Sequence, residues 1–100
     1  MRFCQAAALA LVGWYLMMPP LEGNTGSLKL DLTAPFPQWD IQASFDSAHD
    51  CEIAKVKSVQ WAKDQATNGK FEDENARHAF AWQHYDEECV ATDDPRLKGN

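Results

Sequence analysis

The chain lacks the short motifs that mark most catalytic and metal-binding sites. It contains no HExxH or CxxC pair, no GxSxG serine turn and no glycine-rich phosphate loop. None of its acidic stretches has the spaced acidic and amide residues, with a glycine between them, that a calcium loop needs. The sequence therefore predicts a protein that is not an enzyme and that needs no cofactor.

Basic residues are also scarce. The chain has 9 Lys and Arg against 15 Asp and Glu, which gives a formal net charge of −6 at pH 7. An acidic surface repels the phosphates of nucleic acids and the head groups of anionic lipids. We therefore expect no nucleic-acid partner, and no membrane contact through surface charge.

No uncharged apolar run is long enough to cross a bilayer comfortably. The longest, Ala6 to Met18, follows Arg2 and ends at Pro19 and Pro20, whereas a spanning helix takes about 20 residues. A positive start, a short apolar run and a helix breaker are typical of a secretory signal. We expect residues 1–20 to be a signal peptide or, because no A-x-A-like triplet follows the run, an uncleaved signal-anchor helix. Either form would export residues 21–100.

The remainder predicts a mainly α fold. Residues 21–27 contain two glycines and read as a linker. Residues 28–100 would then form a small domain with an extended segment, in which Trp39, Ile41 and Phe45 lie as a lid across the helices. Apolar periodicity and the Asn68-Gly69 stop predict an antiparallel hairpin of two helices, at about 45–67 and 72–90.

Of the three cysteines, two lie in this domain. A hairpin centred on Gly69 and Lys70 places position 51 opposite position 89, and each cysteine lies on the apolar face of its predicted helix. We expect a Cys51–Cys89 disulfide, with two buried free thiols as the alternative. Closing a loop of about 38 residues stabilises a fold by roughly 3–4 kcal/mol in the chain-entropy model. Such a cross-link fits an oxidising compartment.

A few side chains remain as candidates for binding. His49, His84 and Glu88 would come close together if the disulfide forms, and they are a candidate set for a transition metal or for hydrolysis. His78 and Trp82 fall on the apolar face and are expected in the core. Trp61 falls opposite the apolar arc of its helix, so it is either an exposed partner contact or covered by the segment that carries Trp39.

Two motifs carry a resemblance. Trp39 followed by Phe45-Asp46-Ser47-Ala48-x-x-Cys51, and the stretch from Cys89 to Lys98 with Thr92-Asp93-Asp94-Pro95-Arg96-Leu97-Lys98, resemble a group of short exported bacterial proteins with no assigned function. The resemblance covers about 60 residues and implies a location in the bacterial envelope. It implies no catalytic residues.

These observations lead to one functional expectation and one alternative. The expectation is an exported, disulfide-stapled accessory protein that acts by contact with another envelope protein, in the periplasm or at the outer face of the inner membrane. The alternative is a small metal-binding or hydrolytic periplasmic protein that uses His49, His84 and Glu88.

Overall fold

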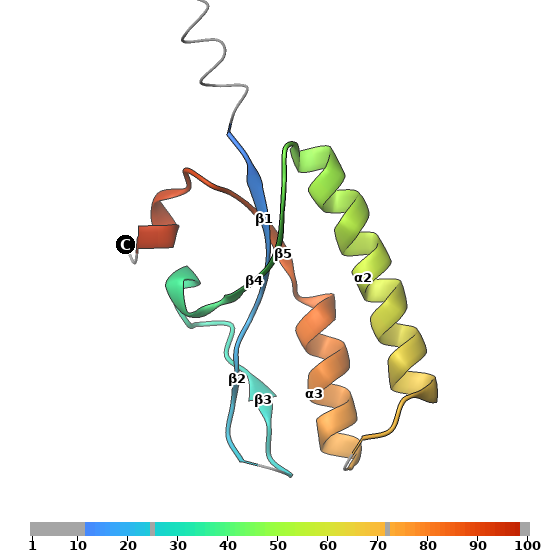
Figure 1. Cartoon of the computed structure of the whole chain (residues 1–100). Coiled ribbons are helices and arrows are strands. Elements are labelled where there is room, and N and C mark those ends of the chain that lie inside the picture. Colours follow the sequence, from blue (N-terminus) through green and yellow to red (C-terminus); the bar gives the residue numbers. More distant parts are fainter. Residues whose placement is uncertain (1–11, 25, 72, 99–100) are drawn as a thin grey trace, which may run out of the picture.

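The computed structural model of the chain describes residues 12–98 except 25 and 72, and it shows a mixed α and β architecture (Figure 1). A three-stranded antiparallel sheet has the strand order β4-β1-β5, and a two-stranded antiparallel sheet pairs β2 with β3. The elements are β1 (Trp14–Met18), β2 (Leu21–Glu22), β3 (Lys29–Leu30), the 3-10 helix η1 (Phe36–Gln38), β4 (Asp40–Phe45), α2 (Ala48–Asn68), α3 (Glu74–Tyr85), β5 (Glu88–Ala91) and the 3-10 helix η2 (Pro95–Lys98).

The expectation of a mainly helical hairpin behind an N-terminal helix is therefore wrong. Trp14–Met18 is the middle strand of the sheet, where Leu16 pairs with Ala43 of β4 on one side and with Cys89 of β5 on the other. A middle strand covered on both faces is apolar at every position, so it has the same composition as part of a signal or membrane helix. Residues 1–11 of the expected signal at 1–20 lie outside the described residues.

The two faces of the sheet are covered by different elements. Successive side chains of a strand point to opposite faces. Met17, which is 1% exposed, packs with Val90, Phe36 and Trp39 on the face under η1. Leu16 lies on the other face, beside Cys89 and under the first turns of α2, which contacts all three strands. The apolar core is therefore split into two thin layers by β1.

The segment before β4 covers the sheet and not the helices. Trp39 is buried, its indole N–H donates to the carbonyl of Ala34 at 2.9 Å, and its ring meets that of Phe36 edge to face at 5.1 Å. Ile41 is more than half exposed on β4. The expected lid across the helices is therefore wrong: Trp39 covers the sheet face opposite α2, and Ile41 and Phe45 belong to strand β4.

The C-terminal turn also covers the sheet face opposite α2. The Asp94 carboxylate accepts hydrogen bonds from the Arg96 side chain and backbone N–H, and these bonds hold the pKa of Asp94 below its ordinary value. The guanidinium of Arg96 lies 4.5 Å above the Phe36 ring. Together these contacts place Leu97 against the core.

Residues 21–27, expected as a linker, begin with β2 and continue into the turn of a β-hairpin. Gly23 has a φ of +100°, which a side chain would strain, and a Cβ there would lie 2.5 Å from the Ser27 carbonyl oxygen. The Asn75 side chain from α3 bonds both the N–H and the C=O of Leu28. The hairpin is therefore attached to α3.

Both helices begin with a side-chain cap. Ser47 accepts from the Asp50 N–H at the start of α2, and Asp73 accepts from the Ala76 N–H at the start of α3. Helix α2 matches the expected range of 45–67 to within a few residues, but α3 ends at Tyr85 and not near residue 90. The chain leaves the helix there because the backbone of Glu88–Ala91 pairs with β1.

The two helices lie side by side with opposite directions (Figure 1). Helix α3 packs against α2 on one flank and against β3 on the other. Within residues 12–98, apart from 25 and 72, no helix has the length and apolar character that crossing a membrane requires.

Candidate functional site

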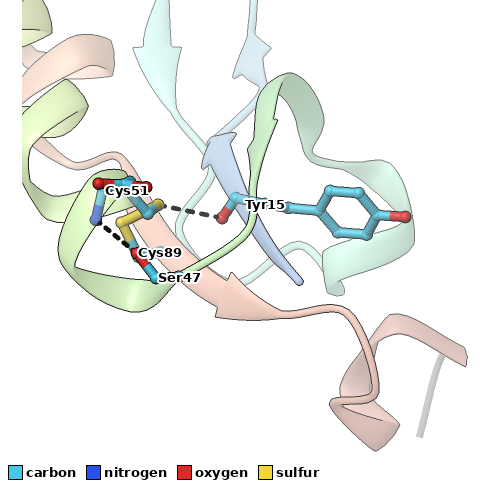
Figure 2. The surroundings of a disulfide bond; sticks show 5 residues. Tyr15, Ser47, Cys51 and Cys89 are labelled. Atoms are coloured by element: carbon cyan, nitrogen blue, oxygen red, sulfur yellow. Dashed lines mark hydrogen bonds between the residues drawn. A yellow bond between two sulfur atoms is a disulfide. The ribbon is translucent and has the colours of Figure 1, made fainter. Parts of the chain in front are cut away.

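The predicted disulfide between Cys51 and Cys89 is present (Figure 2). The Cα atoms of the two residues are 6.0 Å apart, and Cys51 is fully buried. The bond joins the first turn of α2 to strand β5. Figure 2 shows the Cys51 sulfur directed at the backbone carbonyl of Tyr15 in β1, 3.7 Å away. The pairing is confirmed, although it links a helix to a strand where two facing helices were expected.

The disulfide therefore links α2 to the three-stranded sheet. Strand β5 pairs with β1, and β1 pairs with β4, which leads into α2. A cross-link at this point closes a loop with a sequence separation of 38 that contains α3 and all of α2 after its first turn. A disulfide of this kind is consistent with an oxidising, extracytoplasmic environment.

The three candidate metal ligands occupy different surroundings. His49 is exposed in the first turn of α2, Glu88 is exposed on β5, and His84 is buried on α3. Among the residues that the structure describes, no three His, Cys, Asp or Glu side chains gather into a set that could hold a metal ion. The partners of His84 are instead Ser58 and Glu87.

This buried polar cluster is the feature that the sequence did not reveal. The Ser58 hydroxyl lies 3.0 Å from His84 Nδ1, and Glu87 Oε2 lies 3.6 Å from the same nitrogen. Glu87 is 1% exposed, and its Oε1 has no hydrogen-bond partner among the described residues. The only sequence signal was the spacing of His84 and Glu87, which are three residues apart near the end of the predicted second helix.

The geometry of the cluster does not match a catalytic triad. In such a triad the nucleophile and the carboxylate bond opposite nitrogens of the imidazole, so that the ring can relay a proton. Here Ser58 and Glu87 approach the same nitrogen. The cluster holds α2 and the end of α3 together, and it offers no proton relay.

Changing His84 tests this structural role. We expect His84→Ala to lower the free energy of unfolding by about 3 kcal/mol, because it leaves the Glu87 carboxylate buried without its partner. Ser58→Ala removes only one hydrogen bond and should cost about 1 kcal/mol. Urea unfolding followed by circular dichroism measures both. Equal losses for the two variants would contradict the assignment of His84 as the counterpart of Glu87.

Trp61 is half exposed, at 50%, and it belongs to an aromatic cluster on the helix pair. Its ring lies 5.6 Å from that of Phe80 and 5.4 Å from that of His84, both on α3, and Phe71 lies 5.2 Å from Phe80. We call Trp61, Phe71, Phe80 and His84 the Trp61 cluster. Trp39 is part of the core beneath η1 and does not cover Trp61.

Two residues expected in the core are exposed. Trp82 is 50% exposed, and the His78 side chain is largely in solvent. The buried positions of α3 are Ala79, Ala81 and His84. The expectation for His78 and Trp82 is therefore wrong. Helix α3 buries its small residues between α2 and β3, and the side of the helix that carries Trp82 stays exposed.

Comparisons with known proteins give no relative: no family model matches the chain, and no curated protein and no solved structure matches it.

Proposed function

We propose that this chain is an exported, non-enzymatic accessory protein of the bacterial envelope that binds another envelope protein through the Trp61 cluster. The observation that carries the proposal is the half-exposed indole of Trp61, which packs edge to face against the rings of Phe80 and His84. Tryptophan is enriched among the residues that contribute most to protein interfaces. A ring that is already positioned in the free protein loses little entropy when a partner covers it.

The rigidity of the surroundings supports this role. His84 is buried, bonded to Ser58, and lies at the end of α3 nearest to the disulfide. The Trp61 cluster therefore sits on two helices that are connected by packing, by the Ser58–His84 bond and, through β5, by the Cys51–Cys89 bond. Contact surfaces on rigid elements position their side chains better than surfaces on loops.

The location is part of the proposal. The disulfide favours an oxidising compartment, which in a bacterium is the periplasm or the outer face of the inner membrane. The acidic net charge of −6 disfavours anionic lipid and nucleic acid as partners. An envelope protein with an apolar patch and a basic rim would fit both the Trp61 cluster and this charge.

Replacing Trp61 tests the contact. We expect Trp61→Ala to lose at least about 2 kcal/mol of partner binding, which is roughly 30-fold in affinity, because a central tryptophan is removed. The measurement is affinity capture of native envelope extracts on the oxidised protein, followed by titration of the captured partner. Val56→Ala is the matched control, since Val56 is 69% exposed on α2 but lies outside the Trp61 cluster.

Two outcomes would remove the support for this function. One is a partner that binds the Trp61→Ala and Val56→Ala variants equally well. The other is the absence of any captured protein from envelope extracts at native ionic strength. The circular dichroism spectrum of Trp61→Ala should match that of the wild type, so that a loss of binding is not a loss of folding.

A further inference from the structure

A groove lies between the C-terminal half of α2 and the exposed side of α3. It has a volume of about 210 Å³ and is lined by Ala66, Arg77, His78, Ala81, Trp82 and Tyr85. We call it the Trp82 groove. Ala66 and Ala81 are small, so they leave space between the larger side chains. Pockets for drug-sized ligands measure about 300–1,000 Å³, so this groove has room for a group of about the size of one amino-acid residue.

One end of the groove is aromatic. The rings of Trp82 and Tyr85 meet edge to face with their centroids 5.3 Å apart, and Trp82 is 50% exposed. Two aromatic rings that pair edge to face hold each other in position and form an apolar surface. Contact with these two rings would remove an apolar or aromatic group of a ligand from water, and this transfer favours binding.

The other end carries nitrogen donors. Arg77 and His78 lie one helical turn before Ala81 and Trp82, about 6 Å along the helix surface. The Arg77 guanidinium donates a hydrogen bond to the carbonyl of Ala66 in α2 at 3.4 Å. This bond holds one guanidinium nitrogen across the end of the groove. A planar guanidinium binds carboxylates in a bidentate manner.

In the free protein, Glu74 already occupies these donors. Its carboxylate pairs with Arg77 and approaches His78 Nε2 to 4.0 Å. The side chains of Glu74 and His78 are exposed and that of Arg77 is partly exposed, and ion pairs near the surface contribute little to stability. A carboxylate on a ligand can therefore replace that of Glu74 at small cost, and the Glu74–Arg77 pair shows that the donors are placed to receive one.

We propose that the Trp82 groove binds a small carboxylate that bears an aromatic or branched apolar group, with the carboxylate on Arg77 and His78 and the apolar group on Trp82 and Tyr85. The shared chemistry occurs in a free acid of this kind and in the C-terminal residue of a peptide. This site is separate from the Trp61 cluster, so either one can fail without the other.

The experiment uses the oxidised full-length protein labelled with ¹⁵N. N-acetyl-L-phenylalanine and its uncharged amide, N-acetyl-L-phenylalaninamide, are titrated separately to about 10 mM, which covers millimolar dissociation constants. The signal is the indole N–H of Trp82, assigned by its loss in Trp82→Phe. The acid should shift it saturably, and the amide should bind at least about tenfold more weakly, because it lacks the charge-assisted hydrogen bonds.

Two variants separate recognition of the carboxylate from apolar contact. Arg77→Gln should bring the acid down to the affinity of the amide. Lys57→Gln removes the same charge from an exposed position on the outer side of α2 and should leave the difference unchanged. The peptide Ala-Ala-Phe and its amide identify the source: stronger binding of the tripeptide acid than of the N-acetyl amino acid points to a chain terminus, and the reverse points to a free acid.

The proposal is overturned by any of three results. These are equal binding of acid and amide, no shift of the Trp82 signal by either compound, and equal loss of acid binding in Arg77→Gln and Lys57→Gln. None of these results bears on the Trp61 contact, whose readout is a captured protein.

Discussion

A chain that begins at Leu28 will not fold. This shortened chain contains the whole domain that the sequence alone predicts, but it lacks β1, which pairs with both β4 and β5. Without β1 the two remaining strands have no common neighbour. The core also loses Met17, which is 1% exposed, together with Leu16 and Met18. Deleting one buried Leu or Met side chain costs about 2–5 kcal/mol, and a small domain has only about 5–15 kcal/mol in total.

The measurement is thermal and urea unfolding of purified chains, followed by far-ultraviolet circular dichroism. The Leu28 chain should show no cooperative transition. A second chain that begins at Val12 keeps all the described contacts of β1, and it should unfold cooperatively. A cooperative transition of similar midpoint in the Leu28 chain would mean that β1 is not part of the native core.

Removing the disulfide should have the next largest effect. Replacing Cys51 and Cys89 by serine opens a loop with a sequence separation of 38, which costs about 3–4 kcal/mol in the chain-entropy model. In a domain of this size, each kcal/mol lowers the melting temperature by about 4–8 °C. We therefore expect the melting temperature of the double variant to fall by about 12–30 °C.

Two comparisons make this test specific. The wild type treated with a reductant should unfold at nearly the same temperature as the double variant, because both lack the same covalent bond. Cys4→Ser is the matched substitution at the third cysteine, and it should leave the melting temperature unchanged. A fall of similar size in Cys4→Ser would argue that the pairing found in the structure is not the one that stabilises the protein.

We expect a smaller, pH-dependent effect on stability at the C-terminal turn, where Asp94 pairs with Arg96. The Arg96 side chain and backbone hydrogen bonds lower the pKa of Asp94 in the folded state. A carboxylate of this kind contributes stability above its unfolded pKa, and the contribution disappears as pH falls through the folded value. Because the pair is confined to the C-terminal turn and Arg96 is exposed, its loss below about pH 4 should loosen η2 without unfolding the sheet.

The sequence by itself determined the elements that depend on local signals. Helix α2 follows from its apolar periodicity and the Asn68-Gly69 stop, and it ends at Asn68, close to the expected end. The pairing of Cys51 with Cys89 followed from helical spacing on either side of a turn. The turn at Gly69 and Lys70 reverses the chain whatever follows it, so the pairing was correct even though Cys89 lies in a strand.

The tertiary structure alone decided three other features. The apolar stretch around Trp14–Met18 satisfies the pattern of a membrane-directed helix and that of a central strand equally well, and only its neighbours β4 and β5 distinguish them. The end of α3 depends on the backbone bonds that Glu88–Ala91 makes with β1. The apolar face predicted for His78 and Trp82 is not buried, because α3 has neighbours on both flanks and buries Ala79 and Ala81 there instead.

The candidate sites also differ in how far the sequence alone could predict them. Exposure of Trp61 could be expected from its position opposite the apolar arc of α2 only as one of two outcomes, since cover by the segment that carries Trp39 was the other. The Trp82 groove and the buried Ser58–His84–Glu87 cluster could not, because they depend on the lateral position of α3 between α2 and β3. Periodicity gives the angle at which a side chain leaves its own helix, whereas burial depends on where neighbouring elements lie, and that is a property of the whole fold.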